Sequence, residues 1–275
     1  MSRGFVGRAL TVAFLASVFL VLLAPIAVIG LGSLDNAAHA YVAIPPKQFG
    51  IASYLAIKSS YWSALETSVF LGLTAATVAS LIGVPAAIGL VRGRMPGKGF
   101  LLIVLRTPLQ IPALVLGVSF LEMYYAIGQT TGWYAQGSFA GLAIAHTFAV
   151  TPYVVGTLVS VLQRYDSSIE EAATILGATA AGTLWQITLP LLRPGLFAGA
   201  LYAFATSFSE VPISVFLSGS RVSTFPVEVF NALQFDFDPS ILAVSTIVTV
   251  ISLLTVFVMQ RLLGLQTFLN VGAAE

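Results

Sequence analysis

Four long stretches of this sequence carry no Asp, Glu, Lys or Arg, and they are residues 9–34, 67–91, 123–163 and 239–260. A helix of about 20 apolar residues crosses the hydrocarbon core of a bilayer, so each stretch is long enough to span a membrane. The 123–163 stretch is too long for one crossing and must contain the end of one helix, a turn and the next helix. Trp133 and Tyr134 suit that turn, because these aromatic residue types gather at the membrane–water interface. The charge-free stretches therefore predict a protein that crosses a membrane several times.

Composition agrees, since charged residues make up 8% of the chain, against roughly 25% in soluble domains. Two further apolar stretches each hold one acidic residue, Glu122 in one and Glu210 in the other. Gly195 and Gly199 form a GxxxG pattern, which indicates close packing between helices. We expect an all-α integral membrane protein, a single transmembrane domain over 1–275. Its six transmembrane helices are predicted near 9–31, 64–91, 101–127, 139–162, 194–217 and 241–263.

Basic residues gather on one side of this predicted topology. With the N-terminus in the cytoplasm, the cytoplasmic segments contain Arg3, Arg8, Arg92, Arg94, Lys98, Arg164, Arg193 and Arg261. The outer loops contain Lys47, Lys58 and Arg221, together with Asp35, Glu228, Asp236 and Asp238. The positive-inside rule favours this orientation. Both termini and the loop at about 163–193 are therefore expected in the cytoplasm.

The loop at 163–193 has the features of a short helix outside the bilayer. Ser167 or Ser168 can start it, and each has a glutamate three residues on, Glu170 or Glu171, as a capping box requires. The apolar residues that follow have helical spacing and form one face, made of Ile169, Ala172, Ala173 and Leu176. Gly177 is expected to end this helix, since glycine takes a left-handed turn without strain. A second short segment follows, and we expect Pro190 to end it.

This loop resembles the EAA loop of the membrane subunits of binding-protein-dependent ABC importers. The matching positions, at the family's spacing, are Glu171, Ala172, Ala173, Gly177, Ile187, Leu189 and Pro190. The resemblance implies a permease of the type I importer kind, whose coupling helix, with Glu170 beside the motif, docks on a separate ATPase subunit. ATP and magnesium would then be bound by two partner ATPase subunits, and this chain would hold no cofactor. The alternative is an amphipathic helix that lies on the lipid surface.

Charged residues inside the predicted spans are candidates for the transport pathway, because an ionisable group in the bilayer is costly unless it faces a cavity or a partner. Glu210 lies about 25 Å along a helix from Arg193, in the outer half of the membrane. The polar residues that precede Glu210 at helical spacing are Tyr202, Thr206 and Ser209. Glu122 lies at a similar depth in the third span, with Tyr125 beside it. Alternatively, each glutamate pairs with a hydroxyl or backbone group and holds helices together.

The segments SFSEVPISVFLSG at 207–219 and FPVEVFN at 225–231 resemble the fifth span and outer loop of spermidine/putrescine-type permeases. This resemblance implies import of a small organic solute, with a polyamine or related amine as the best guess, across a bacterial cytoplasmic (inner) membrane. A buried acid with aromatic neighbours suits a cationic amine. The implied partners are a second, usually non-identical permease, the ATPases and an extracytoplasmic solute-binding protein.

Other functions find little support in the residues. The segment GRMPGKG at 93–99 lacks the spacing and the hydroxyl residue of a phosphate-binding loop. The chain has no Cys, and its two His residues, His39 and His146, lie far apart in the sequence. We therefore expect no metal site, no catalytic residues and no role as an enzyme or nucleic-acid binder. The main alternative is a secondary transporter, driven by an ion gradient, with Glu210 and Glu122 as proton or ion sites.

Overall fold

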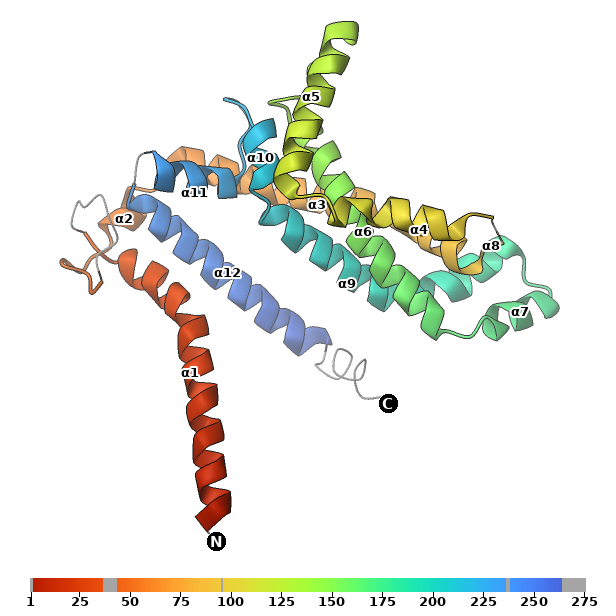
Figure 1. The fold of residues 1–275 in the computed structure, drawn as a ribbon, viewed down its shortest axis with the longest axis horizontal. Coiled ribbons are helices and arrows are strands. Elements are labelled where there is room, and N and C mark those ends of the chain that lie inside the picture. The colour runs from red at the N-terminus through yellow and green to blue at the C-terminus, as the bar shows by residue number, and fades with distance from the viewer. Residues whose placement is uncertain (1, 37–43, 95, 236–237, 264–275) are drawn as a thin grey trace. The chain divides into compact units, whose positions relative to one another are not determined.

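The structure, a computed structural model, describes residues 2–36, 44–94, 96–235 and 238–263. Asp236, assigned to an outer loop from the sequence, and His39 both lie outside the described residues. Figure 1 shows a chain built from helices. Their bounds are α1 Ser2–Gly32, α2 Ala52–Leu55, α3 Ser59–Arg92, α4 Lys98–Arg106, α5 Ala113–Thr131, α6 Phe139–Arg164, α7 Ser168–Ile175, α8 Ala180–Thr183, α9 Leu189–Phe208, α10 Pro212–Leu217, α11 Phe225–Gln234 and α12 Ser240–Leu263. A 3₁₀ turn at Thr107–Leu109 follows α4, and a π turn at Leu184–Thr188 precedes α9.

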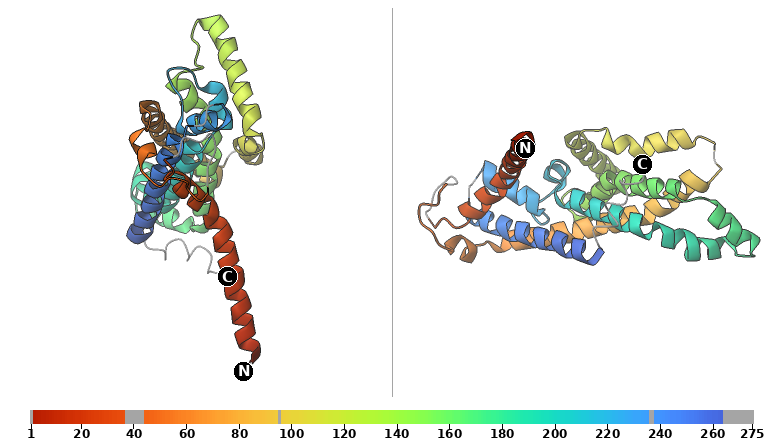
Figure 2. Two further views of the ribbon diagram at one scale, coloured as in Figure 1. Left: turned by 90° about the vertical axis from the view of Figure 1, so that its left-hand side faces the viewer. Right: turned by 90° about the horizontal axis from the view of Figure 1, so that it is seen from below.

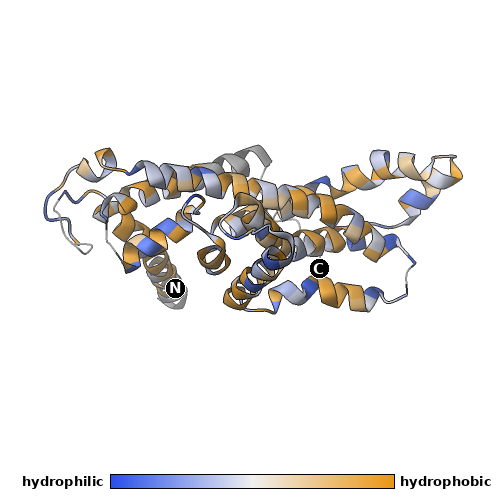
Figure 3. Cartoon of the chain, turned by 90° about the horizontal axis from the view of Figure 1, so that it is seen from above, coloured by the Kyte–Doolittle hydropathy of each residue, from blue (hydrophilic) through white to orange (hydrophobic). Residues whose placement is uncertain are grey.

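Four helical stretches of the described chain are long and apolar enough to cross a membrane, and they are Leu10–Gly32, Ser59–Arg92, Phe139–Arg164 and Ala180–Phe208. A fifth crossing is possible if α4 and α5 form one broken span. The described apolar part of α12 is shorter, Ser240–Leu254. Figure 3 shows hydrophobic residues along the helices and hydrophilic residues at several helix ends and in connecting segments. The all-α membrane fold is confirmed, whereas the count of six spans stays a prediction.

Two of the predicted spans are not single helices. The span expected at 101–127 is divided between α4 and α5, which meet at an angle of 98°. The span expected at 194–217 is divided between α9, which ends at Phe208, and α10, which starts at Pro212. Proline has no N–H to donate and disfavours helical geometry in the residue before it. Pro108 and Pro112 explain the first break in this way, and Pro212 explains the second.

The described chain divides into two compact units, one drawn from Met1–Tyr61 with Asn231–Glu275 and the other from Trp62–Phe230. In the second unit, α6 and α9 pack along one another (Figure 2, green and teal). A Cβ atom at Gly195 would lie 2.6 Å from Val161 Cγ2, and one at Gly199 would lie 3.3 Å from the Val154 Cα atom. The GxxxG pattern therefore brings the two helix backbones together, as predicted.

Two apolar clusters fill this second unit. One joins α3, α6 and α9 through fully buried side chains that include Ala79, Leu158 and Leu192. The other joins α5, α6 and α10 through side chains that include Leu142 and Leu217. These clusters support the two irregular segments that concern function, which are the loop from α6 to α9 and the break between α9 and α10.

The first unit has its own contacts. α1 packs on α12, where the Thr246 hydroxyl lies 3.4 Å from the Ile29 carbonyl oxygen. Lys58 Nζ and Asp238 Oδ2 form an ion pair of 2.9 Å. The first contact joins α12 to α1, and the second joins the residue before α3 to the segment before α12.

Candidate functional site

The short helix predicted in the 163–193 loop is present as α7, Ser168–Ile175. Gly177 follows it with φ of +89°. The Gly177 N–H donates to the Thr174 carbonyl at 3.0 Å and the Ala178 N–H donates to the Ala173 carbonyl at 2.9 Å. This pair of bonds is the Schellman arrangement, which satisfies carbonyls at a helix end. The predicted stop at Gly177 is therefore confirmed.

The start of α7 differs from the capping box expected at Ser167 or Ser168. Neither serine side chain caps the helix, and instead Asp166 Oδ1 accepts a hydrogen bond of 3.0 Å from the Ser168 N–H. The Ser168 backbone N–H and hydroxyl, both bonded to Asp166, lower the pKa of that carboxyl below its usual value. An aspartate is as good an acceptor at this position as a serine. The capping box prediction was wrong because an acceptor one residue earlier takes its place.

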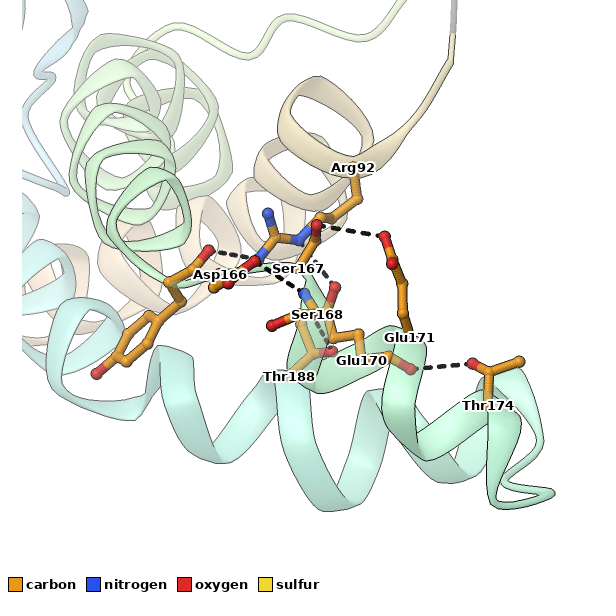
Figure 4. A network of polar contacts seen from close by, with 9 residues as sticks. Arg92, Asp166, Ser167, Ser168, Glu170, Glu171, Thr174 and Thr188 are labelled. Carbon is orange, nitrogen blue, oxygen red and sulfur yellow. Dashed lines mark hydrogen bonds and ion pairs between the residues drawn. The ribbon is translucent and has the colours of Figure 1, made fainter.

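Glu170, predicted to contact an ATPase, points inward in this chain (Figure 4). Its Oε2 atom lies 2.8 Å from Arg92 Nε, at the last residue of α3. Its Oε1 atom accepts a hydrogen bond of 2.8 Å from the Thr188 hydroxyl in the π turn. Arg92 Nη2 also donates to the Tyr165 carbonyl oxygen at 3.1 Å. One glutamate thus joins α3, α7 and the segment that leads into α9.

The neighbouring motif residues face outward. Glu171, Ala172 and Gly177 are exposed, and Ala173 is half-buried. Two large apolar side chains at the end of α7 are more exposed still, Ile175 (85%) and Leu176 (87%). Leu176 belongs to the predicted apolar face, but Ile175 was missed, although a bulky apolar residue close to the motif glycine is a signal for docking. Trp185 (70% exposed), in the π turn, instead lines a groove with residues of α3 and α9. We refer to Ile175 and Leu176 as the loop tip.

The second half of the motif lies at the start of α9. Ile187, Leu189 and Pro190 are half-buried. Pro190 does not end a helix as expected, since α8, the π turn and α9 follow one another without a gap from Ala180 to Phe208. Pro190 lies in the first turn of α9, directly after the π turn, and that irregular turn accommodates the bond that the missing N–H cannot make. The motif therefore leads from the loop directly into a spanning helix.

Glu210 lies in the break after α9 and not on a continuous helix. Its Oε2 atom accepts a hydrogen bond of 3.1 Å from the Ile213 N–H, in the first turn of α10. The carboxylate is partly buried. The side chain thus caps α10, and this bond agrees with the alternative in which the glutamate pairs with a backbone group and holds helices together.

The break is also fixed by a residue that the sequence did not single out. His146 of α6 is buried, with Nδ1 2.8 Å from the Ser207 hydroxyl and Nε2 3.0 Å from the Ser214 hydroxyl. Ser207 lies near the end of α9 and Ser214 in α10. A neutral imidazole donates from one nitrogen and accepts at the other, so it can bond both hydroxyls. His146 therefore joins the two sides of the break.

The polar stripe that precedes Glu210 lies on the outer face of α9. Tyr202 is exposed and its ring meets that of Tyr153 edge-on, with centroids 4.8 Å apart. Thr206 is half-buried and Ser209 is exposed, whereas Ala203 is fully buried against the core. Tyr202 and Ala203 therefore face different surroundings, as the helical spacing predicts.

The candidates in α5 are exposed within their own unit. Glu122 and Tyr125 both lie on an outer surface of α5, and the Tyr125 ring meets that of Tyr134 edge-on at 6.4 Å between centroids. Tyr124 instead points inward and donates to the Gly141 carbonyl oxygen at 2.7 Å. No contact in the described residues joins Glu122 to Glu210, so their common role in a pathway stays a prediction.

Residues 79–266 match the family of binding-protein-dependent transport system inner membrane components. The putrescine transport system permease protein PotI of Escherichia coli is 35% identical over 68% of this chain and 66% of its own length, so the match spans just under two thirds of that relative. The spermidine/putrescine transport system permease protein PotC of the same organism is 28% identical over 97% of this chain and 98% of its own.

One solved structure extends the comparison to the fold. It is a bacterial ABC transporter involved in the import of the acidic polysaccharide alginate, with a TM-score of 0.72, 18% identity, and coverage of 96% of this chain and 97% of that one. At this identity the likeness concerns the fold alone. With the family match, the loop motif and the apolar helices taken together, the chain belongs to the family of binding-protein-dependent transport system inner membrane components and is a multi-pass membrane protein.

Proposed function

We propose that this chain is the permease subunit of an ATP-driven ABC importer that moves a small organic cation across a bacterial cytoplasmic membrane. The observation that carries the proposal is the loop between α6 and α9. Its tip exposes Ile175 and Leu176, while Glu170 holds the base of the loop to α3 and the start of α9. A firmly held segment with large exposed apolar side chains suits a docking element.

The partners follow from this role. Two ATPase subunits, which bind ATP and magnesium, would receive the loop tip in the cytoplasm. Both termini would lie on the same side, in agreement with the basic residues there. A second, non-identical permease would complete the pathway, and a solute-binding protein would deliver solute at the outer face. This chain acts as a transport subunit and hydrolyses no ATP itself.

A polyamine or related amine is the solute we propose. The polyamine permeases PotI and PotC support this choice through their similarity to the chain. The partly buried Glu210, in the break after α9, adds a negative charge, and the exposed Tyr202 of α9 adds an aromatic ring. A carboxylate and aromatic faces both attract an organic ammonium group.

Reconstitution of the transporter with its partner subunits in proteoliposomes tests the proposal. Uptake of radiolabelled putrescine or spermidine should require ATP on the side of the vesicle membrane that carries the ATPase subunits. It should proceed without an ion gradient. Uptake driven by a proton gradient in the absence of ATP would instead identify a secondary transporter. A neutral diol of the same length as putrescine is the matched control for the charge of the solute, and its uptake at the same rate would contradict selection for a cation.

A further inference from the structure

Two adjacent glutamates in the loop have opposite surroundings. The Glu171 side chain is exposed, and the Ser167 hydroxyl, 3.4 Å from Oε1, is its contact among the described residues. The Glu170 carboxylate has 16% of its surface exposed and the Arg92 side chain 22%, and their closest atoms are 2.8 Å apart. Of these two glutamates, only Glu171 is therefore placed to meet a partner protein.

The Glu170 carboxylate is held from two directions. Arg92 approaches one oxygen from the end of α3, and Thr188 donates to the other from the π turn before α9. Thr188 is itself buried. The Thr174 hydroxyl, on the next turn of α7, donates to the Glu170 carbonyl at 3.0 Å. Because both oxygens have partners on different elements, α7 cannot shift against α3 or α9 without loss of a contact to a largely buried charge.

Arg92 is suited to this place for a second reason. It is the last residue of α3, where a cation is favoured by the helix dipole. Its Nη2 atom also donates to the Tyr165 carbonyl, in the segment between α6 and α7. The guanidinium thus contacts both the start of the loop, at Tyr165, and α7 itself, at Glu170.

We propose that the Arg92–Glu170 pair is a positioning joint that carries movement of the coupling helix α7 into α3. The inference rests on the proposed function, since it assumes that an ATPase moves the loop tip. The chain itself connects α7 to α6 and α9, so those helices would follow the loop in any case. The joint adds α3, which is linked to α7 through side chains and not through adjacent residues in the sequence.

α3 can pass such a movement on toward the other end of the unit. Near its beginning, Ser68 is buried and its hydroxyl accepts a hydrogen bond of 2.8 Å from the Phe225 N–H, at the start of α11. Between Ser68 and Arg92, α3 packs into the apolar cluster with α6 and α9. A displacement at Arg92 therefore reaches α11 through one helix.

Three variants of the assembled transporter test this joint: Arg92→Gln, Glu170→Gln and the charge exchange Arg92→Glu with Glu170→Arg. In each single variant the ATPase should still co-purify and hydrolyse ATP, while solute imported per ATP hydrolysed should fall about tenfold, a factor typical of the loss of a coupled pair. The charge exchange should restore more than half of that loss. Glu171→Gln, the matched control on the exposed side chain, should weaken ATPase association without the same change in the ratio.

A second measurement compares one preparation before and after a cross-link, so poor assembly of a variant cannot account for the difference. The chain has no native cysteine, so Arg92→Cys with Glu170→Cys can be joined by a short bifunctional thiol reagent. Uptake should be low before the cross-link forms and should rise several-fold afterwards. Unchanged import per ATP in Arg92→Gln, or no gain on either charge exchange or cross-linking, would overturn the joint. Absence of ATP-driven uptake in the wild-type transporter would instead refute the proposed function.

Discussion

The loop between α6 and α9 and the break between α9 and α10 both interrupt the regular helices of the second unit, but they place their side chains in opposite ways. The loop turns large apolar side chains outward at its tip and keeps the Glu170 charge inside. The break turns its polar groups inward, where His146 and two serines bond one another.

This difference follows from the surroundings of each segment. Water can satisfy the polar backbone of a loop outside the bilayer, which leaves its side chains free to form a docking surface. Within a membrane no water is at hand, so backbone and side-chain polar groups must find partners inside the protein. The exposed side chains of the loop are therefore available for contact with a partner protein, whereas the polar groups of the break must be paired within this chain.

The largest expected effect tests the docking side of this contrast. Leu176→Asp should weaken binding of the ATPase subunits about 100-fold, because it removes a large apolar contact and would bury a charge. Co-purification of the detergent-solubilised complex and titration of the ATPase measure the effect. Leu176→Met, which keeps size and polarity, should bind normally. Full-strength binding by Leu176→Asp would show that the loop tip is not the docking surface.

The break should respond in stability and not in docking. His146→Phe leaves the Ser207 and Ser214 hydroxyls without their partner and should cost roughly 2–6 kcal/mol, since each of the two buried unpaired groups costs about 1–3 kcal/mol. Thermal unfolding in detergent measures this loss. The triple variant His146→Leu, Ser207→Ala and Ser214→Ala should recover much of it, because no polar group is then left unpaired. A His146→Phe protein as stable as the wild type would show that the bonds from His146 to the two serines do not stabilise the break.

Glu210 decides whether the break also serves transport. Glu210→Gln retains an oxygen that can accept from the Ile213 N–H but removes the charge, so uptake of a cation should fall about tenfold. Solute binding to the separate binding protein should be unaffected. Cysteines at Tyr202, Thr206 and Ser209 should react with water-soluble reagents, while one at the buried Ala203 should not. Normal uptake together with an unreactive stripe would leave Glu210 with the capping role alone.

A smaller effect is expected at the end of α7. Gly177→Ala places a Cβ atom at φ of +89°, which should cost about 1 kcal/mol locally. Amide hydrogen exchange should therefore become faster across α7, with little change elsewhere. Gly99→Ala, at a helical glycine with open space around it, should have no such cost and serves as the control. Unchanged exchange in α7 would argue against the Schellman end as a source of stability.

The smallest effect concerns pH at the other end of α7. The pKa of Asp166 is lowered by its hydrogen bonds from Ser168, so the folded loop favours the ionised carboxylate. The stabilisation of the folded loop by ionised Asp166 is complete above the pKa of the unfolded state, and it is lost as the pH falls through the lowered pKa of the folded state. Exchange in the first turn of α7 should speed up in acid, and Asp166→Asn should remove that dependence. An equal acid response in Asp166→Asn would assign it to another group.

Local chemistry made much of this structure predictable. Apolar runs and the pattern around Gly177 depend on neighbours in the sequence, and α7 and three of the spanning helices (Leu10–Gly32, Ser59–Arg92 and Phe139–Arg164) follow the expected positions. The errors have local causes too: Asp166 replaced a serine as the cap, and Pro190 opened a helix that it was expected to end. A proline is compatible with either position, and only the following apolar run distinguishes them.

The parts that could not be predicted depend on pairs far apart in the chain. Glu170 meets Arg92, and His146 meets Ser207 and Ser214. Nothing in the local pattern of a lone histidine or of one of two adjacent glutamates reveals such a partner. These contacts depend on how α3 packs near α7 and on how α6 packs against α9 and α10.

The glycine contacts between α6 and α9 limit how this unit can change shape. A Cβ added at Gly195 would lie 2.6 Å from Val161 Cγ2, and this close fit leaves the two helices little freedom to move past one another. We therefore expect α6 and α9 to move as one body, with bending confined to segments outside their contact, such as the proline-rich turn at 107–112.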